Sequence, residues 1–472
     1  MIGRTRGPAG WHGRLGHRHR AGEGGFTLIE LLVVIIILGI LAAVVVFAVG
    51  GVGDKGEAAA TEIDRRTLAT AEEAYFARNG RYGTEAELVG GGFLSEQSST
   101  HKIYLNTAAG SCPAGSKCTY SIGLDDEPAT LTVYIGRSST LVGPLLTQFS
   151  ADTGIAVTPN YGSGTGDKST LLASLLVTEG AGTPADAFFA QDAANLGKVS
   201  RAGLFKTAPA GASGKVLEPG FQAEDNTWTA VSGRVRVIAH NPAVTPAASV
   251  PDDVDDLLTQ PARSVGYDPN NASFQNFVAA MILQRGVAAT QTWLNTFQTG
   301  AGYCVAGNRN IAAAVALNPL SIKLGLINHY YRFQGPTGTP VFNTADVVNT
   351  YPVSTLADPD PGSLINTAGI GILANTDSPG AAEMFVRYML ENGAQTYYKD
   401  QTSEYPVVAS VAPRPELVAL SSIQAPNRVN GLDLNDLNID DAVAAETAAG
   451  MLPTTNSPTG TGAPNSCRST IP

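Results

Sequence analysis

An uninterrupted apolar stretch lies near the N terminus of the chain. Residues 26–49 read FTLIELLVVIIILGILAAVVVFAV, and Glu30 is the only strongly polar side chain among them. As an α-helix, about 24 residues at ~1.5 Å each match the ~30 Å hydrocarbon core of a membrane. A secretory signal peptide would have an apolar region of about 7–15 residues followed by a small-residue cleavage site, and neither feature is found. The stretch therefore predicts a membrane-spanning helix.

The charge of the chain is distributed unevenly around this stretch. Residues 1–25 hold five arginines and one glutamate, a net charge of +4, whereas the whole chain carries -11, so the remainder carries -15. An excess of Lys and Arg is typical of the cytoplasmic side of a membrane segment. The acidic remainder argues against a partner with a phosphate backbone, and we expect no nucleic-acid binding.

Glu30 is the informative residue of the apolar stretch. A carboxylate at the centre of a membrane helix costs about 2.5–3.5 kcal/mol, and less near a helix end, so it needs a compensating partner. The string GFTLIEL at positions 25–31 resembles the processing motif of type IV prepilins. This resemblance implies that a prepilin peptidase cleaves after Gly25 and methylates the new N terminus at Phe26. It also implies that Glu30 pairs with the N-terminal amine of a neighbouring pilin subunit.

The pilin-like pattern continues beyond the membrane segment. Apolar residues recur there at near-helical spacing, at Ile63, Leu68, Ala71 and Tyr75. The spacing predicts a long helix that ends at Asn79-Gly80. Short strand candidates such as KCTYSI follow, so a small pilin-like head is expected. It is shorter than most pilin heads, which makes processing and anchoring firmer expectations than assembly into a filament with other pilin subunits.

Four cysteines are present in a chain that is expected to be exported. Cys112 and Cys118 are six positions apart. This spacing favours a small disulfide loop in an oxidising compartment, with two free thiols as the alternative. No CxxC pair or histidine partner indicates zinc. The states of Cys304 and Cys467 stay open.

From Thr130 onward, apolar strand candidates alternate with amphipathic helices. LTVYIG, IAVTPNY and ADAFFA each precede a helical pattern. Such alternation predicts parallel sheets covered by helices. Ligand sites in these folds lie beyond the carboxyl ends of strands, where backbone N–H groups and helix N-termini hold anions. The corresponding loops are 136–139, 161–169, 190–194 and 232–236.

The same region resembles the periplasmic binding proteins of iron(III) ABC transporters. The matching stretches include VYIGRSSTLVGPLLTQFSADTGI, PADAFFAQDAANLG, AVSGRVRVIAHNP, PNNASFQNFVAAM, GLINHYY, INTAGIGILANT, EYPVV and LSSIQAP, over roughly residues 130–452. The resemblance implies an α/β, two-lobed periplasmic-binding-protein fold of type II, whose lobes close over a ligand about a hinge.

These observations divide the chain into five expected regions. They are a prepilin leader (1–25), a transmembrane pilin helix (26–53), a small α+β pilin-like head (54–128), a two-lobed solute-binding domain (129–452) and a flexible tail (453–472).

The resemblance implies that Tyr330 and Tyr331 supply phenolates to a ferric ion. A hard trivalent cation prefers oxygen donors and holds a phenol deprotonated below its usual pKa of about 10. Adjacent residues of a regular strand point to opposite faces, so both side chains reach one ion only where the strand ends or bends. The pair is therefore expected at the cleft.

Three positions depart from the family pattern. Ser138 stands where many relatives have a histidine, Gln191 where some have a glutamate, and His240 where others have a third tyrosine. His240 is either a substitute nitrogen ligand or a strand histidine bonded to the backbone.

Ferric sites in this family often include carbonate, phosphate or another anion held by the second lobe. The matching residues here are Ser232, Gly233, Arg234, Asn328 and Asn308. Arg234 or Arg236 would pair with an oxyanion through two hydrogen bonds, or form an ion pair across the hinge instead.

No GxSxG, HExxH or CxxC motif is present, so the sequence offers no catalytic constellation and we expect no enzyme. The expected protein is anchored at the cell surface, carries a large extracellular domain, and passes ferric iron with a synergistic anion to an ABC permease. One alternative keeps the fold but binds an oxyanion or organic phosphate without metal. Another is a structural pilin or adhesin subunit.

Overall fold

The computed structural model describes residues 60–107, 112, 118–163, 167–207, 217, 221, 223–317, 322–333, 344–452 and 467. The predicted membrane helix and the prepilin motif with Gly25, Phe26 and Glu30 lie outside these residues. Within the part of the chain that the structure describes, no helix combines the length and apolar character that a membrane crossing requires. From Asp64 onward the chain forms one compact unit.

The head begins with a helix whose described part covers 60–79, so it ends at Asn79-Gly80 as predicted. Leu68, Ala71 and Tyr75 are buried on one face of this helix, whereas Ile63 is 65% exposed and is not part of the core. Short helix α2 (Glu85–Gly90) begins with a capping box of Thr84 and Glu87, which satisfies backbone donors at the helix start. Strands β1 (His101–Leu105) and β2 (Tyr120–Leu124) pair antiparallel and complete the small α+β head.

All four cysteines form disulfides. Cys112 pairs with Cys118, with Cα atoms 5.9 Å apart, as predicted. Cys304 pairs with Cys467, and their Cα atoms are 4.7 Å apart. The second bond attaches the C-terminal tail, which we expected to be flexible, to the large domain at Cys467.

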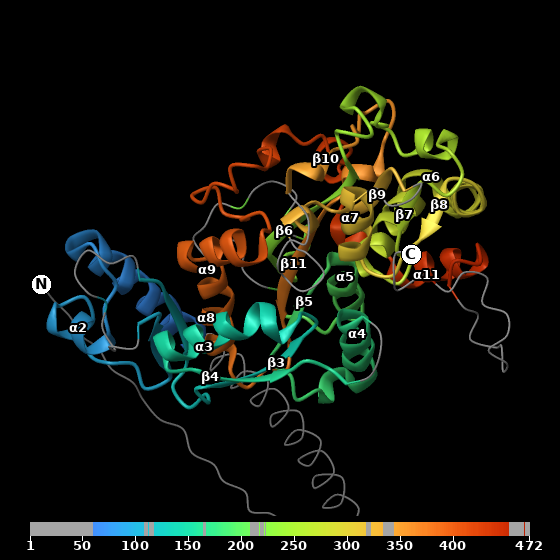
Figure 1. Ribbon diagram of the computed structural model, residues 1–472. Coiled ribbons are helices and arrows are strands. Elements are labelled where there is room, and N and C mark those ends of the chain that lie inside the picture. Colours follow the sequence, from blue (N-terminus) through green and yellow to red (C-terminus); the bar gives the residue numbers. More distant parts are fainter. Residues whose placement is uncertain are drawn as a thin grey trace, which may run out of the picture. The chain divides into compact units, whose positions relative to one another are not determined.

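The large domain is built on a sheet of nine strands (Figure 1). The strand order is β4 (Ala156–Asn160), β3 (Thr130–Ile135), β5 (Ala187–Ala190), β11 (Ile365–Ile372), β6 (Thr229–His240), β9 (Leu324–Asn328), β7 (Val265–Tyr267) and β8 (Gly302–Cys304), with β10 (Val348–Thr350) on β6. Strands β4, β3 and β5 are parallel to one another, and so are β9, β7 and β8. The predicted parallel βα units are therefore confirmed, and they form the two lobes.

Strands β6 and β11 join the two parallel groups. The first half of β6 pairs antiparallel with β11, from Thr229 to Val235. Its second half, from Arg236 to His240, pairs with β9. All twelve residues of β6 are buried, so one continuous strand belongs to both lobes. This shared strand provides the hinge that a two-lobed binding fold requires.

Helices gather around each group of strands (Figure 1). In the first lobe they are α3 (Ser139–Thr153), α4 (Lys168–Glu179), α5 (Ala193–Arg201), α8 (Pro379–Met389) and α9 (Asn392–Tyr397). In the second lobe they are α6 (Ala272–Thr299), α7 (Asn308–Leu317) and α11 (Ile439–Ala448). The N-termini of α3, α4 and α5 follow β3, β4 and β5 directly, which brings those helix starts to one edge of the sheet.

The head packs on the first lobe through the start of α8. The Glu127 carboxylate accepts backbone N–H groups of Gly380 and Ala381 at 3.0 and 2.9 Å. Ser121 Oγ donates to the Gly380 carbonyl at 2.8 Å. A Cβ at Gly380 would clash with the backbone of Gly123, so the close approach requires glycine. The head, which was expected to end at residue 128, is thus in tight contact with α8 of the solute-binding domain.

Candidate functional site

Tyr330 and Tyr331 lie immediately after the end of β9. The strand stops at Asn328 and the chain turns into a short 3₁₀-helix, η4 (His329–Phe333). The expectation that the strand ends at this pair is confirmed. Both tyrosines line one cavity of about 310 Å³, and their ring centroids are 4.4 Å apart. The turn therefore brings two adjacent phenols to the same space.

His329 fixes the turn that carries the tyrosines. Its Nδ1 accepts the N–H of Val235 on β6 at 3.1 Å, and its Nε2 bonds the Ser403 carbonyl at 3.0 Å. Burial lowers the pKa of His329 to about 3, so the ring is neutral at ordinary pH. A neutral imidazole with one acceptor and one donor matches both bonds. His329 is thus a positioning residue and not a ligand.

The two phenols have different surroundings. Asn328 Nδ2 donates to Tyr330 Oη at 3.3 Å and to Ser273 Oγ at 2.9 Å. Burial, followed by the neighbouring Tyr330, raises the pKa of Tyr331 well above its usual value. Ionisation of Tyr331 in this place therefore needs a strong cation to stabilise the phenolate.

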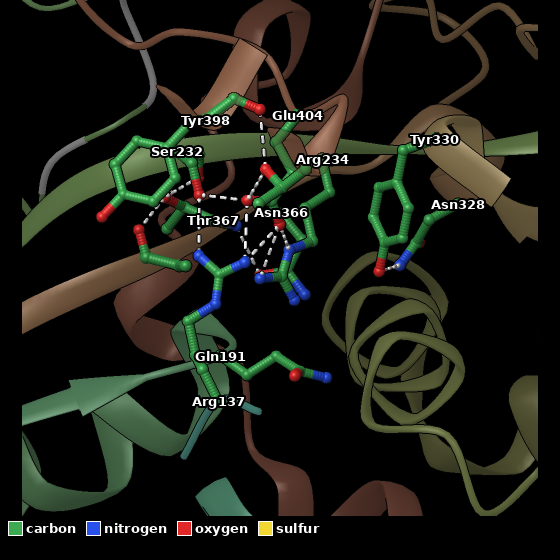
Figure 2. Close-up of polar contacts among 12 residues, drawn as sticks. Arg137, Gln191, Ser232, Arg234, Asn328, Tyr330, Asn366, Thr367, Tyr398 and Glu404 are labelled. Atoms are coloured by element: carbon green, nitrogen blue, oxygen red, sulfur yellow. Dashed lines mark hydrogen bonds and ion pairs between the residues drawn. The ribbon is translucent and has the colours of Figure 1, made fainter. Parts of the chain in front are cut away.

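A buried ionic network forms the wall beside the tyrosines. Figure 2 shows Arg137 and Arg234 converging on Glu404 and Ser232. Arg137 Nη2 donates to both Glu404 oxygens at 2.9 and 2.8 Å, and Arg234 Nε donates at 2.9 Å. Ser232 Oγ and Thr402 Oγ1 each donate to the same carboxylate at 2.9 Å. Burial alone would raise the pKa of Glu404, but the two arginines lower it to about 2.

The network leaves the cavity wall positively charged. Two guanidinium groups face one carboxylate, which leaves a net charge of +1, because arginine stays protonated. Arg137 is 3% exposed and Arg234 is 1% exposed. Among the described residues, neither Arg137 Nε nor Arg234 Nη1 has a hydrogen-bond partner. Buried cationic donors of this kind favour an anion in the cavity.

The structure brings several of the predicted anion-binding residues to the cavity that Tyr330 and Tyr331 line, or close beside it. Arg234 and Asn308 line the cavity, and within the described ranges neither side-chain atom of the Asn308 amide has a partner. Ser232 lies beside it but is engaged with Arg137 and Glu404. The Gly233 N–H donates to the Tyr405 carbonyl at 2.8 Å.

His240 and Arg236 lie elsewhere. His240 is six residues beyond Arg234, about 20 Å along an extended strand. It pairs with Leu324 at the start of β9, whereas the tyrosines follow the end of that strand. The structure thus separates His240 from the tyrosines, which favours the alternative of a strand histidine over that of a nitrogen ligand. Arg236 donates to the Leu326 carbonyl at 2.7 Å, and it does not line the cavity.

Two residues of the site went unrecognised in the sequence, Arg137 and Glu404. Arg137 stands in the loop 136–139 that follows the first strand, so its position after a strand was the available signal. Glu404 lies about 270 positions away in the chain, and only the fold brings it to Arg137.

Gln191 lines the cavity as well. Within the described ranges, no group of three or more His, Cys, Asp or Glu side chains is placed to hold a metal ion.

Comparisons with known proteins agree with this architecture. The chain is 29% identical over 324 residues to a Fe(3+)-binding periplasmic protein of Serratia marcescens, which covers 68% of this chain and 90% of that protein. It is 27% identical over 301 residues to a major ferric iron-binding protein of Neisseria meningitidis, covering 63% and 87%. The structure matches iron-bound HitA from Pseudomonas aeruginosa with a TM-score of 0.58 and 26% identity, over 68% of this chain and all of that one.

Two family patterns match the sequence. The prokaryotic N-terminal methylation motif matches residues 20–46, which contain Gly25, Phe26 and Glu30. The pattern of the bacterial extracellular solute-binding proteins matches residues 172–426, more than half of the chain. That match includes β6, β9, both tyrosines and Glu404. The chain therefore belongs to the bacterial extracellular solute-binding protein family.

Proposed function

We propose that this protein captures ferric iron, together with a synergistic anion, between the two lobes of its extracellular domain and passes it to an ABC permease. Members of this family are transport proteins that work with such permeases and are not enzymes. In the proposed complex Tyr330 and Tyr331 bind the ion as phenolates. Arg234, Asn308 and Asn328 bind or orient the anion.

The observation that carries this proposal is the pair of adjacent phenols on one cavity beside a cationic wall. Fe³⁺ offsets the burial that keeps the proton on Tyr331, and phenolate oxygens are donors that a hard cation prefers. An ion with three positive charges and two phenolates retains one positive charge, and the arginine network adds another. An anion such as carbonate or phosphate would balance both. The ferric relatives in Serratia and Neisseria support the choice of iron.

The N-terminal methylation motif indicates how the domain is held. We propose cleavage after Gly25 by a prepilin peptidase, methylation of Phe26 and retention by the apolar stretch that follows. The mature protein is then expected in the membrane fraction with a methylated N-terminal phenylalanine, which mass analysis of the N-terminal peptide detects. An intact leader in the mature protein would contradict this part of the proposal.

Ferric titration of the full chain in detergent tests iron binding. We expect a visible charge-transfer band from tyrosinate to iron in the presence of carbonate or phosphate. Tyr330→Phe and Tyr331→Phe should each weaken or abolish it. Tyr303→Phe, on β8 and outside the cavity, is the control and should leave the band unchanged. A band that survives both substitutions, or no band with any anion, would refute the proposed site.

Arg137 Nε and Arg234 Nη1, which have no hydrogen-bond partner in the part of the chain that the structure describes, favour a second candidate, a metal-free oxyanion or organic phosphate. Calorimetry with phosphate in iron-free buffer distinguishes it. This candidate predicts tight binding that Tyr331→Phe does not alter, whereas the ferric proposal predicts tight phosphate binding only when iron is present.

A further inference from the structure

A buried charged cluster lies in the second lobe, outside the cavity that the tyrosines line. It consists of Asp268, which directly follows β7, Arg236 on β6 and Glu446 on α11. All three side chains are buried, and none of them lines the cavity. Buried charged groups are costly unless they are paired or hydrogen-bonded, so the contacts of this cluster indicate what it does.

Asp268 connects two loops beside the cavity. Its Oδ2 accepts the Gly307 N–H at 2.8 Å, and its Oδ1 accepts the Asn270 N–H at 3.1 Å. Strands β7 and β8 are parallel neighbours, so the loops that follow them, 268–271 and 305–307, leave the same edge of the sheet. Both loops contribute to the lining of the cavity, through Asn271 and Gly307. One carboxylate thus fixes the two loops relative to each other.

Gly307 is the point from which α7 begins. Its carbonyl accepts the N–H groups of Asn310 and Ile311 at 3.0 and 3.1 Å, and its φ of +86° lies in the left-handed region that favours glycine. Asn308, the first residue of α7, is buried at the cavity, and neither atom of its amide has a partner among the described residues. The Gly307 N–H is therefore the contact through which Asp268 determines where the Asn308 amide lies.

Asp268, and not Glu446, carries the negative charge of the cluster. Burial raises the pKa of Asp268 above its usual value, but its two backbone N–H partners and Arg236 oppose this shift. Burial raises the pKa of Glu446 well above its usual value, and the charge of Asp268 raises it further. One guanidinium does not balance two buried carboxylates, so Glu446 keeps its proton and Asp268 is the charged partner of Arg236. A charged carboxylate is a stronger hydrogen-bond acceptor than a neutral group.

We infer that Asp268 is a positioning residue for the anion of the cargo: its carboxylate, through the Gly307 N–H, holds the Asn308 amide where the anion accepts a hydrogen bond from it. The inference rests on the proposed binding of an anion in this cavity and adds a residue outside the cavity that determines how tightly the anion is held. Asp268 acts on the affinity for the anion and not on the tyrosines, which follow β9.

Anion titration at a fixed iron concentration tests the inference. The full chain in detergent is mixed with iron and a reference chelator, and phosphate is added while the charge-transfer band is followed. Asp268→Asn keeps the size of the side chain but removes its charge and replaces one acceptor oxygen by a donor nitrogen. We expect half of the band to require at least about tenfold more phosphate, as the loss of one charge-assisted hydrogen bond implies. The band at saturating phosphate should keep its wavelength, because the tyrosines are unaltered.

Two further variants separate positioning from a general loss of structure. Glu446→Gln replaces a neutral carboxyl group of the same buried cluster by a neutral amide, so it should leave the phosphate requirement unchanged. Asn308→Ala should raise the phosphate requirement by itself. Asp268→Asn should then add little to it, because the amide that Asp268 positions is already absent.

Gly307→Ala provides a second route to the same measurement if Asp268→Asn does not fold. A Cβ at Gly307 has room, since the nearest atom, Asn310 Nδ2, is 3.8 Å away. The left-handed φ nevertheless disfavours alanine, so the turn that carries Asn308 shifts. We expect a similar increase in the phosphate requirement, and an unchanged requirement would overturn the inference.

The outcomes distinguish this inference from the function on which it rests. An unchanged phosphate requirement for Asp268→Asn would overturn the inference, and so would a lower one, which would mean that the charge of Asp268 only repels the anion. An equal increase for Glu446→Gln, or full additivity with Asn308→Ala, would also overturn it. The absence of a band with every anion in the original protein would overturn ferric capture but not the role of Asp268. Calorimetry with phosphate in iron-free buffer then decides: weaker binding by Asp268→Asn supports the inference, and equal binding overturns it.

Discussion

Glu404 is the residue on which the cationic wall depends. Its buried carboxylate accepts hydrogen bonds from Arg137, Arg234, Ser232 and Thr402. An ion pair of this kind is only weakly stabilising compared with apolar packing, but removal of one partner leaves a buried charge without compensation. The network thus holds both guanidinium groups at the cavity. Their placement depends on the single carboxylate of Glu404.

Glu404→Gln should lower the free energy of unfolding by about 3–5 kcal/mol, because two buried arginines would then lack their counter-charge. Urea unfolding of the ligand-free protein measures this change. Glu416→Gln is the matched control, since Glu416 pairs with Arg414 on the surface and should cost less than about 1 kcal/mol. Similar losses of unfolding free energy for the two variants would show that the two arginines do not depend on Glu404 for their counter-charge.

His329 should make the protein sensitive to acid. The pKa of His329 is lowered from 6.5 to about 3 by burial, so below pH 6.5 the unfolded chain takes up a proton that the folded protein does not. The contribution of His329 is therefore fully present above pH 6.5 and is lost as the pH falls towards 3. Unfolding free energies measured across this range should fall less steeply for His329→Gln, whose amide retains one donor and one acceptor. Equal slopes for both proteins would contradict the neutral, buried state of His329.

At the scale of elements, the sequence predicted the parts that rest on local patterns. The alternation of apolar strands and helices predicted β3, β4 and β5 with their helices. The rule of opposite faces predicted that the strand before Tyr330 and Tyr331 ends or bends there, and β9 does end just before them, at Asn328. The sequence did not predict that β6 belongs to both lobes, because the strands that pair with β6, β11 and β9, lie far from it in the chain. For the same reason the sequence left both alternatives for His240 open: its distance from the tyrosines depends on strand register.

The bond between Cys304 and Cys467 should matter more for stability than the one in the head. It spans 163 positions, whereas Cys112 and Cys118 are 6 positions apart, and a longer closed loop restricts the unfolded chain more. Cys467→Ser is expected to lower the unfolding free energy by about 2–4 kcal/mol, and Cys118→Ser by less. Chemical denaturation of both variants under oxidising conditions measures the difference. A larger loss for Cys118→Ser would reverse this ranking.

At the scale of the whole molecule, the head and the first lobe are joined by a specific interface. Arg65 pairs with Glu383 at 3.3 Å, in addition to the contacts of Glu127 and Ser121 with Gly380. The sequence placed a boundary near residue 128 but gave no sign of this interface, because α8 lies about 250 positions further along the chain. The head therefore holds the binding domain in a defined orientation.

Gly380→Ala should disrupt this interface without disturbing the ligand site. The added Cβ meets the backbone of Gly123, which cannot move as a flexible side chain would. We expect faster proteolytic cleavage near residue 128 and an unchanged ferric titration. Gly393→Ala is the control, because a Cβ there meets no atom within 4 Å. Resistance to protease equal to that of the original protein would argue against the interface.

The attachment of the head to α8 also determines which half of the site moves. Helix α8 packs on α3 through Phe385 against Phe149 and through Tyr388, which donates to Asp152 at 2.6 Å, so it belongs to the lobe that carries Arg137. When the lobes close about β6 and β11, that lobe stays with the head, and the lobe with Tyr330 and Tyr331 travels. Seen from the head, Arg137 is therefore the stationary partner, and the second lobe carries Tyr330, Tyr331 and Asn308 towards it.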